Sequence, residues 1–355
     1  EAVLLQDAGL PDPRDTEYEN VVALDGLIVV VHRDNPVRSI SMGEIAQVFS
    51  GQVTNWSELG GPDMPITVHA RDAGSGTFET FESLVLDPTG LSVSEDAVRF
   101  ESNADLSDSV ASDRTAIGFT GFAYARASRV LPIRQECGLL SYPTTFAIKP
   151  EEYPLARRLY LYTTERQAPV HAENLMKFAM SEQAAPFVED AGFISLEPEG
   201  QGLREQGMRL THAMIAEDEF SLPLMREMLT EFRDAERLST TFRFTPGSSQ
   251  LTAQSQRDAE AFARDIVAGK YNGKEILLVG FTDSIGQFEL NQALAERRAQ
   301  GVLFTMSEAV SDLAGAANFE GADISVRGYG ELTPVGCNTT FSGRVANRRV
   351  EVWVR

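Results

Sequence analysis

The 355-residue sequence contains only two cysteines and four histidines. Two cysteines cannot define a disulfide framework, and four histidines without metal-ligand spacing give no reason to expect a zinc site or any cofactor. Basic residues are also scarce, because 31 Lys and Arg stand against 52 Asp and Glu, which gives a net charge of −21. Such a chain does not suit nucleic acid, whose binding depends on basic side chains that neutralise phosphates.

Other common signals are missing as well. There is no apolar run of about 20 residues, so we expect no membrane span. The chain opens with EAVLLQDAGL and not with a Met, a basic segment and an apolar segment, so we expect any export signal to have been removed. No triad, metal cluster or paired carboxylate indicates an enzyme. We expect Cys137 and Cys337, which lie in different predicted domains, to be unpaired with each other.

Residues 280–298 are the most informative stretch. Residues 274–281 have the β-branched and apolar character of a strand, turn residues follow, and a helix then begins. Asn291 and Arg298 share one face of this helix, and Asp283 lies at the strand end beside it. An anion and a cation around one small gap suit a zwitterionic ligand whose ammonium and carboxylate share a carbon. The alternative is a surface salt bridge, worth about 0–1 kcal/mol.

Several separated motifs occur between residues 238 and 355. They are Thr282-Asp283, Asn291, Leu294, Arg297-Arg298-Ala299, Gly328-Tyr329-Gly330-Glu331, Pro334, Asn338, Gly343-Arg344 and Asn347-Arg348-Arg349-Val350-Glu351. In this order and spacing they resemble the OmpA-like peptidoglycan-binding domain. The resemblance implies that Asp283, Asn291 and Arg298 hold the diaminopimelate residue of the peptidoglycan stem. We place Thr282 and Arg348 at the same site, although Arg344, Arg348 and Arg349 could instead fix the termini of neighbouring elements.

The expected fold of this domain is βαβαββ. The strands and helices are expected at residues 240–244, 252–269, 274–281, 287–308, 323–330 and 348–354, with Thr252 as a helix N-cap. They predict a mixed sheet with helices on one side. Residues 347–355 alternate apolar and polar side chains, which predicts a sheet with one face in water. Phe281 stands where the OmpA-like family usually has His, and we expect that position to be structural.

The first half of the chain reads as α/β. A near-continuous apolar strand is expected at residues 21–32, and a helix with a Ser41 and Glu44 capping box at residues 41–51. A strand at 65–70 runs through a glycine turn into a helix at 71–86. This geometry makes an anion site, because free helix N–H groups point at the ligand and glycine lets the backbone approach closely. An ordinary capped helix is the alternative.

Five segments extend this pattern. They are residues 23–37, 49–61, 71–81, 101–110 and 116–125, and in order they resemble the phosphate-binding (PstS-like) branch of type 2 periplasmic binding proteins. The resemblance implies that Arg71, Ser75, Gly76 and Thr77 bind an oxyanion such as phosphate. Asn103 is a further cleft candidate, although residues 101–110 could equally form a capped surface helix.

The resemblance also implies domain limits. We expect a PstS-like domain at 1–205, a helical linker at 206–237 and the OmpA-like domain at 238–355. Within the first domain, residues 38–122 are expected to form a complete second lobe, whereas 19–33 and 124–195 form a first lobe that is truncated at its N-terminus. Residues 1–18 read as an irregular or partly helical lead-in. An uncovered sheet edge on an incomplete lobe invites a homodimer.

Together these observations predict a non-enzymatic cell-envelope protein. It would bind peptidoglycan through diaminopimelate and present a phosphate-binding-type domain in the periplasm, at the cell wall or outer membrane. One alternative is the phosphate receptor of an ABC transporter, tethered to the wall. Another is an envelope scaffold whose receptor domain has lost its ligand.

Overall fold

The computed structural model describes residues 19–162, 169–216, 221–245, 247–314, 319 and 321–355. The lead-in expected at residues 1–18 therefore lies outside the described residues. The chain divides into two compact units, Glu1–Glu197 and Pro198–Arg355, where the sequence predicts a boundary after residue 205. None of the described helices has the length and apolar character needed to cross a membrane.

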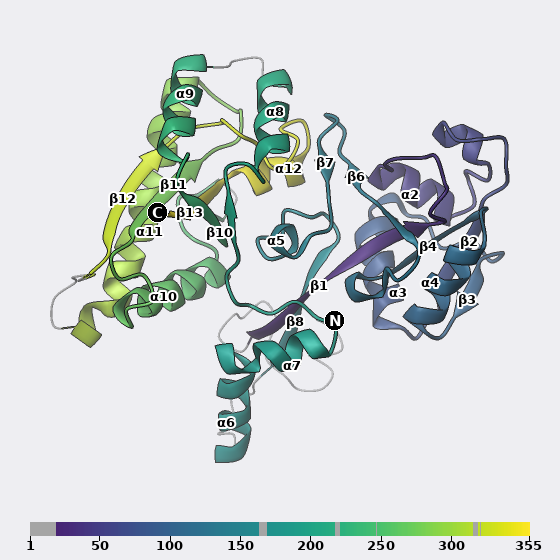
Figure 1. Ribbon diagram of the computed structural model, residues 1–355, viewed down its shortest axis with the longest axis horizontal. Helices are drawn as coiled ribbons and strands as arrows, with labels where there is room; N and C mark the ends of the chain where they lie inside the picture. The colour runs from purple at the N-terminus through teal and green to yellow at the C-terminus, as the bar shows by residue number, and fades with distance from the viewer. Residues whose placement is uncertain (1–18, 163–168, 217–220, 246, 315–318, 320) are drawn as a thin grey trace. The chain divides into compact units, whose positions relative to one another are not determined.

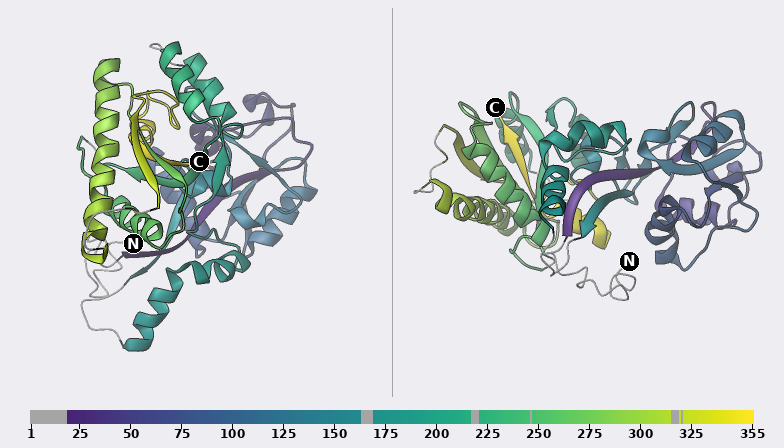
Figure 2. Two further views of the ribbon diagram at one scale, coloured as in Figure 1. Left: turned by 60° about the vertical axis from the view of Figure 1, so that its left-hand side comes forward. Right: turned by 90° about the horizontal axis from the view of Figure 1, so that it is seen from below.

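Strand β1 (Glu19–Val31) organises the first unit (Figure 1). Its C-terminal half lies between β4 and β5 in a sheet of order β3-β2-β4-β1-β5, whereas its N-terminal half pairs with β8. Figure 2 shows β1 as one curved strand. The other strands are β2 (Thr67–Arg71), β3 (Val98–Phe100), β4 (Ala116–Gly121), β5 (Arg129–Leu131) and β8 (Ala156–Tyr162).

Both faces of the C-terminal half of β1 are buried, which explains its continuous apolar sequence. Leu27, Val29 and Val31 pack on the face covered by α2 (Met42–Phe49) and α3 (Gly76–Phe81). Ile28 and Val30 pack on the opposite face, against α4 (Asn103–Ser112). The expected strand and the capping box of α2 are both confirmed, since Ser41 and Glu44 exchange side-chain and backbone hydrogen bonds.

Shorter elements complete the first unit. They are η1 (Trp56–Leu59), η2 (Glu82–Leu86), η3 (Asp87–Thr89), η4 (Phe122–Tyr124), β6 (Ile133–Arg134), β7 (Leu140–Ser141), α5 (Thr145–Ile148), α6 (Val170–Ala179), η5 (Glu182–Ala184) and α7 (Ala185–Asp190). Within the described part of the chain, β8 pairs with β1 alone, and α6 has no buried residue.

The second unit is built on a mixed five-stranded sheet of order β12-β11-β13-β10-β9, in which only β11 and β12 run parallel. Its strands are β9 (Gly200–Gly202), β10 (Glu236–Arg243), β11 (Glu275–Phe281), β12 (Asp323–Gly328) and β13 (Arg349–Val354). Its helices are α8 (Gly207–Ala216), α9 (Leu222–Glu231), α10 (Ala253–Val267), α11 (Phe288–Ala314) and α12 (Phe341–Asn347). Thr252 caps α10 as predicted.

Helices cover both faces of this sheet, so the expectation of helices on one side is wrong. Ile276 and Leu278 of β11 pack with α10 and α11, whereas Leu277 and Val279 pack with α8 and α9. Phe232 stacks on Trp353 of β13 with ring centroids 4.1 Å apart. Ala213 of α8 and Leu224, Met225 and Met228 of α9, expected in a linker, therefore belong to the core of the second unit.

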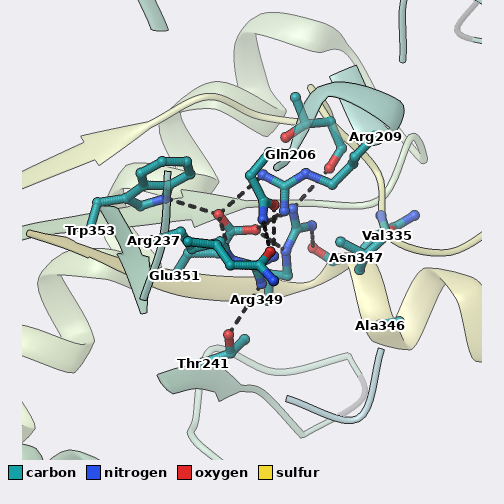
Figure 3. Close-up of polar contacts among 12 residues, drawn as sticks. Gln206, Arg209, Arg237, Thr241, Val335, Ala346, Asn347, Arg349, Glu351 and Trp353 are labelled. Atoms are coloured by element: carbon teal, nitrogen blue, oxygen red, sulfur yellow. Dashed lines mark hydrogen bonds and ion pairs between the residues drawn. The ribbon is translucent and has the colours of Figure 1, made fainter. Parts of the chain in front are cut away.

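A buried ion cluster explains a second error, which concerns the alternation at residues 347–355. Glu351 is fully buried and contacts Arg209 of α8, Arg237 of β10 and Arg349 of β13 at 2.6, 3.3 and 2.7 Å (Figure 3). Trp353 Nε1 donates to the same carboxylate. Polar side chains alternate here because they are neutralised under α8 and not because one face meets water.

The expectation of two unpaired thiols is also wrong. No free cysteine is present, and Cys137 and Cys337 are both disulfide-bonded. The predicted domain limits, which come from the family resemblance, carry no information on whether a cysteine is oxidised.

Candidate functional site

The end of β11 and one face of α11 carry the polar residues that the sequence singles out in the second unit. Thr282 and Asp283 directly follow β11, and Asn291 and Arg298 lie two turns apart on α11. All four are at most 8% exposed. Their predicted proximity is confirmed, because Asn291 Nδ2 lies 3.3 Å from the main-chain oxygen of Asp283 and Arg298 interacts electrostatically with Asp283.

Glycines hold the two elements at this close distance. A Cβ at Gly280 would collide with the main-chain oxygen of Ala295 on α11. After β12 the chain crosses the same helix at Gly330, which has a φ of +58° and whose carbonyl accepts from Thr282 N. Side chains at these positions would push α11 away from the strand ends, so the site depends on close backbone packing.

Arg348 pairs with Asp283. Its Nη1 lies 2.6 Å from Asp283 Oδ2, and the other carboxylate oxygen accepts from Ile285 N at 3.1 Å. Arg344 and Arg349 lie elsewhere, since Arg344 Nη1 donates to the Asn338 carbonyl and Arg349 belongs to the Glu351 cluster. Of these three arginines, the structure therefore brings Arg348 to the candidate site.

Several buried donors at this site have no hydrogen-bond partner among the described residues. They are Nε and Nη1 of Arg298, Nε of Arg348 and Oγ1 of Thr282. Burial lowers the pKa of Arg298, Arg348 lowers it further, and Asp283 acts in the opposite direction. Buried donors are normally satisfied, so this cluster is suited to accept an anionic group from a ligand.

Glu331 is a site residue that sequence reasoning named within a motif but gave no role. It is 5% exposed, and its Oε2 accepts from Asn291 Nδ2 at 2.7 Å. The signal available in the sequence was its place next to Gly330, at the end of a strand that runs parallel to β11. Parallel strands bring their carboxyl ends to one edge of a sheet, so Glu331 and Asp283 meet there.

The strand, the glycine turn and the helix start that the sequence predicts in the first unit are present. Strand β2 leads through Gly74 to Ser75, which caps α3 by accepting from Thr77 N. A Cβ at Gly74 or Gly76 would meet nothing within 4 Å, so the backbone faces open space there. Thr77 is buried beside it. A small anion can therefore approach the start of α3.

Arg71 is held by the chain that follows β3. Its Nε and Nη2 donate to the carbonyls of Phe100 and Glu101 at 3.2 and 2.6 Å. Burial lowers the pKa of Arg71, while Asp72, Tyr124 and Glu101 oppose that shift. Asn103 begins α4, and its Oδ1 is buried without a partner among the described residues. The Arg71 guanidinium is thus held in place, and Asn103 lies near it, after the neighbouring strand β3.

Arg157 is a residue near the loop that sequence reasoning missed. From β8 it donates to the Gly76 carbonyl at 2.9 Å and to Thr80 Oγ1 at 2.7 Å. Its Nε and Nη2 both contact Asp25 Oδ2 of β1. Asp25 is 3% exposed, so the pair is buried on the carboxylate side and ties α3 to strands β1 and β8.

Comparison with known families matches both halves of the chain. Residues 18–183 match a PBP superfamily domain, and residues 243–348 match the OmpA family. The chain joins a PBP superfamily domain to an OmpA family domain. The expected architecture, PstS-like α/β lobes followed by an OmpA-like domain, is therefore confirmed at the level of the family.

Similar curated proteins cover the PBP domain. Phosphate-binding protein PstS of Borreliella burgdorferi is 26% identical over 188 residues, which are 50% of this chain and 66% of that protein. Protein SphX of Synechococcus elongatus is 30% identical over 187 residues, or 49% and 55% of the two chains. The chain thus spans between 55% and 66% of the length of these relatives.

A solved structure covers the same part of the chain. An ABC-type phosphate transport receptor from Vibrio cholerae has a TM-score of 0.45 and 27% identity, and it covers 50% of this chain and 72% of its own.

Proposed function

We propose that the OmpA domain binds the diaminopimelate residue of peptidoglycan. The observation that carries this proposal is the cluster of buried, unpartnered donors on Arg298, Arg348 and Thr282 beside the Asp283 carboxylate. A carboxylate can accept from the donors while an ammonium on the same carbon reaches Asp283. Because both ligand charges then meet opposite charges in a buried site, a zwitterionic carbon is the group that the geometry fits best.

The experiment is co-sedimentation of the full chain with purified peptidoglycan. Sacculi with diaminopimelate stems are compared with sacculi with lysine stems, which keep an ammonium but lack the second carboxylate. We expect the chain to sediment with the first and to stay largely in the supernatant with the second. Equal sedimentation with both would contradict recognition of the zwitterionic carbon.

For the PBP domain we propose an oxyanion-binding role centred on Arg71, Ser75, Gly76, Thr77 and Asn103. The support is the open backbone at Gly74 and Gly76 next to a fixed guanidinium, together with the similarity of this domain to phosphate-binding proteins. We place the protein in the periplasm, associated with the wall. Calorimetry with inorganic phosphate tests this role. The absence of any heat of binding would favour the alternative of an envelope scaffold whose receptor domain has lost its ligand.

We also propose that the first unit can form a homodimer through β8. In the described residues this strand pairs on one side only, and Leu161 is 39% exposed. A strand at the edge of a sheet can add a strand of a second copy through its main-chain groups. Sedimentation equilibrium of the chain and of Leu161→Lys, in which an added charge blocks the edge, tests it, because dimerisation must weaken in the variant.

A further inference from the structure

The side-chain amide of Asn291 lies between two groups that can only accept hydrogen bonds. The Glu331 carboxylate is 2.7 Å from Nδ2, and the main-chain carbonyl of Asp283 is 3.3 Å from the same atom. Asn291 and Glu331 are 4% and 5% exposed, so water does not replace these partners. A carboxylate and a carbonyl both need a donor, so the NH₂ group of Asn291 must face them.

This orientation uses both hydrogens of the amide. The carbonyl oxygen Oδ1 is left without a hydrogen-bond partner among the described residues. A Cβ at Gly286 would lie 3.4 Å from Oδ1, so the loop that follows Asp283 passes this atom with a residue that has no side chain. Asn291 therefore presents an acceptor, and not a donor, to whatever enters beside it.

We propose that Glu331 is a positioning residue that fixes the Asn291 amide so that the site accepts only a ligand with a free N–H donor, an ammonium group. This inference rests on the proposed function of the same site and assigns its two sides. Arg298, Arg348 and Thr282 provide donors for a carboxylate. Asn291 Oδ1 and Asp283 provide acceptors for the ammonium. Glu331 binds the NH₂ group of Asn291 and so keeps Oδ1 turned toward the ligand.

Exchanging the two polar groups tests this assignment, because Asp can accept hydrogen bonds but cannot donate them when ionised. Asn291→Asp alone places two carboxylates together, so we expect a lower Tm and weaker binding. Glu331→Gln alone can turn either its amide oxygen or its NH₂ group toward Asn291, so it no longer fixes the orientation of that amide, and we expect weaker binding with a smaller loss of Tm than in Asn291→Asp. In the double variant Asn291→Asp/Glu331→Gln, the glutamine donates to the new carboxylate, whose second oxygen still faces the ligand.

We expect the double variant to recover part of the Tm lost in Asn291→Asp, since the Asp283 carbonyl still lacks its donor, and to sediment with diaminopimelate-type sacculi better than Asn291→Asp does. In Asn291→Asp the charge-assisted hydrogen bond to Glu331 is replaced by repulsion between two carboxylates, so residue 291 is displaced from the ligand and binding should weaken about 10- to 100-fold. Sacculi whose free amino groups have been N-acetylated serve as the second probe, because acetylation replaces the ammonium by a neutral, bulkier amide that keeps a single N–H. They should not retain the wild type or the double variant.

The outcomes separate the two proposals. If the wild type does not sediment with untreated sacculi, the proposed function is wrong, and the Tm values of the four proteins still decide the orientation. If the wild type sediments and the folded double variant does not, Asn291 acts as a donor and the inference is overturned. Equal retention on acetylated and untreated sacculi, or an Asn291→Asp variant as stable as the wild type, would overturn it too.

Discussion

Arg348 Nη1 lies 2.6 Å from Asp283 Oδ2, so the carboxylate of the candidate site is already paired with an arginine of the protein. The sequence suggests a different pair, with Asp283 opposite Arg298 across a gap. Arg298 instead keeps Nε and Nη1 without a partner among the described residues, and the hydrogen bond from its Nη2 to the Ser248 carbonyl is 3.5 Å long. The two arginines thus have different roles. Arg348 neutralises the charge of Asp283, and Arg298 remains available for an anionic ligand group.

The first prediction follows from this division. Arg298→Ala and Asp283→Ala should each abolish co-sedimentation with diaminopimelate-type peptidoglycan, because each leaves one ligand charge unpaired. In a desolvated site that loss should cost on the order of 2–5 kcal/mol. Arg297→Ala is the matched control, since Arg297 is the exposed neighbour on the same helix. Sedimentation of both site variants at the wild-type level would refute the assignment of this site.

The second prediction concerns the pH dependence of stability. Burial would raise the pKa of Glu351, but Arg209, Arg237 and Arg349 outweigh it and hold that pKa far below its usual range. A depressed folded-state pKa contributes stability above the unfolded value of about 4.3, and this stability is lost as pH falls below it. The free energy of unfolding should therefore decrease as the pH is lowered from 5 to 3.

Glu351→Gln should remove much of this acid dependence. It should also destabilise the chain by about 3–5 kcal/mol at pH 7, because three arginines lose their shared buried counter-charge. Glu236→Gln, at an exposed position of β10, is the control. Equilibrium urea denaturation at several pH values measures both effects, and parallel pH profiles for wild type and Glu351→Gln would contradict the argument.

The elements that sequence reasoning located correctly are those set by local rules. The apolar run of β1, the capping box of α2, the N-cap Thr252 and the shared helix face of Asn291 and Arg298 depend on residues that lie close together in the chain. They follow from side-chain periodicity and from the free N–H groups of a helix start. The strand, glycine turn and helix around Ser75 belong to the same group.

What sequence reasoning missed depends on distant partners. A carboxylate at position 351 could be exposed to water or buried. It can be buried because Arg209 and Arg237, which lie far away in the sequence, neutralise it. The Asp283–Arg348 pair likewise joins β11 to the residue before β13, and Asn291 meets Glu331 only because α11 packs on the strand ends. No local sequence pattern indicates such pairs, because each partner, taken alone, is a polar or charged residue of a kind usually found at the surface.

The third prediction concerns Arg157. Replacing it by Ala should destabilise the first unit by about 3–5 kcal/mol, because Asp25 would remain buried and unpaired. It should also speed hydrogen exchange in α3, which loses the donors to Gly76 and Thr80. Arg114→Ala is the comparison, since Arg114 pairs with Asp34 at the surface and is worth about 0–1 kcal/mol. Equal losses in the two variants would show that the Asp25 pair is not special.

The last prediction is that this chain binds inorganic phosphate weakly, with a Kd above about 1 mM. Arg71 already donates Nε and Nη2 to the carbonyls of Phe100 and Glu101, so little of its guanidinium is left for an anion. Arg71 and the start of α3 also reach the ion from one side only, so most of its oxygens would stay hydrated. Long-range electrostatics oppose the approach of a dianion, because residues 1–205 contain 15 Lys and Arg against 32 Asp and Glu, a difference of −17.

Isothermal titration calorimetry on the wild type, Arg71→Ala and the exposed control Arg33→Ala measures this weak binding. Any residual heat of binding should disappear in Arg71→Ala and persist in Arg33→Ala. Submillimolar affinity that is lost in Arg71→Ala would show that the loop at residues 71–77 suffices for phosphate. Further hydrogen-bond donors would then have to close around the bound phosphate. The expected truncation of the first lobe would in that case not weaken phosphate binding.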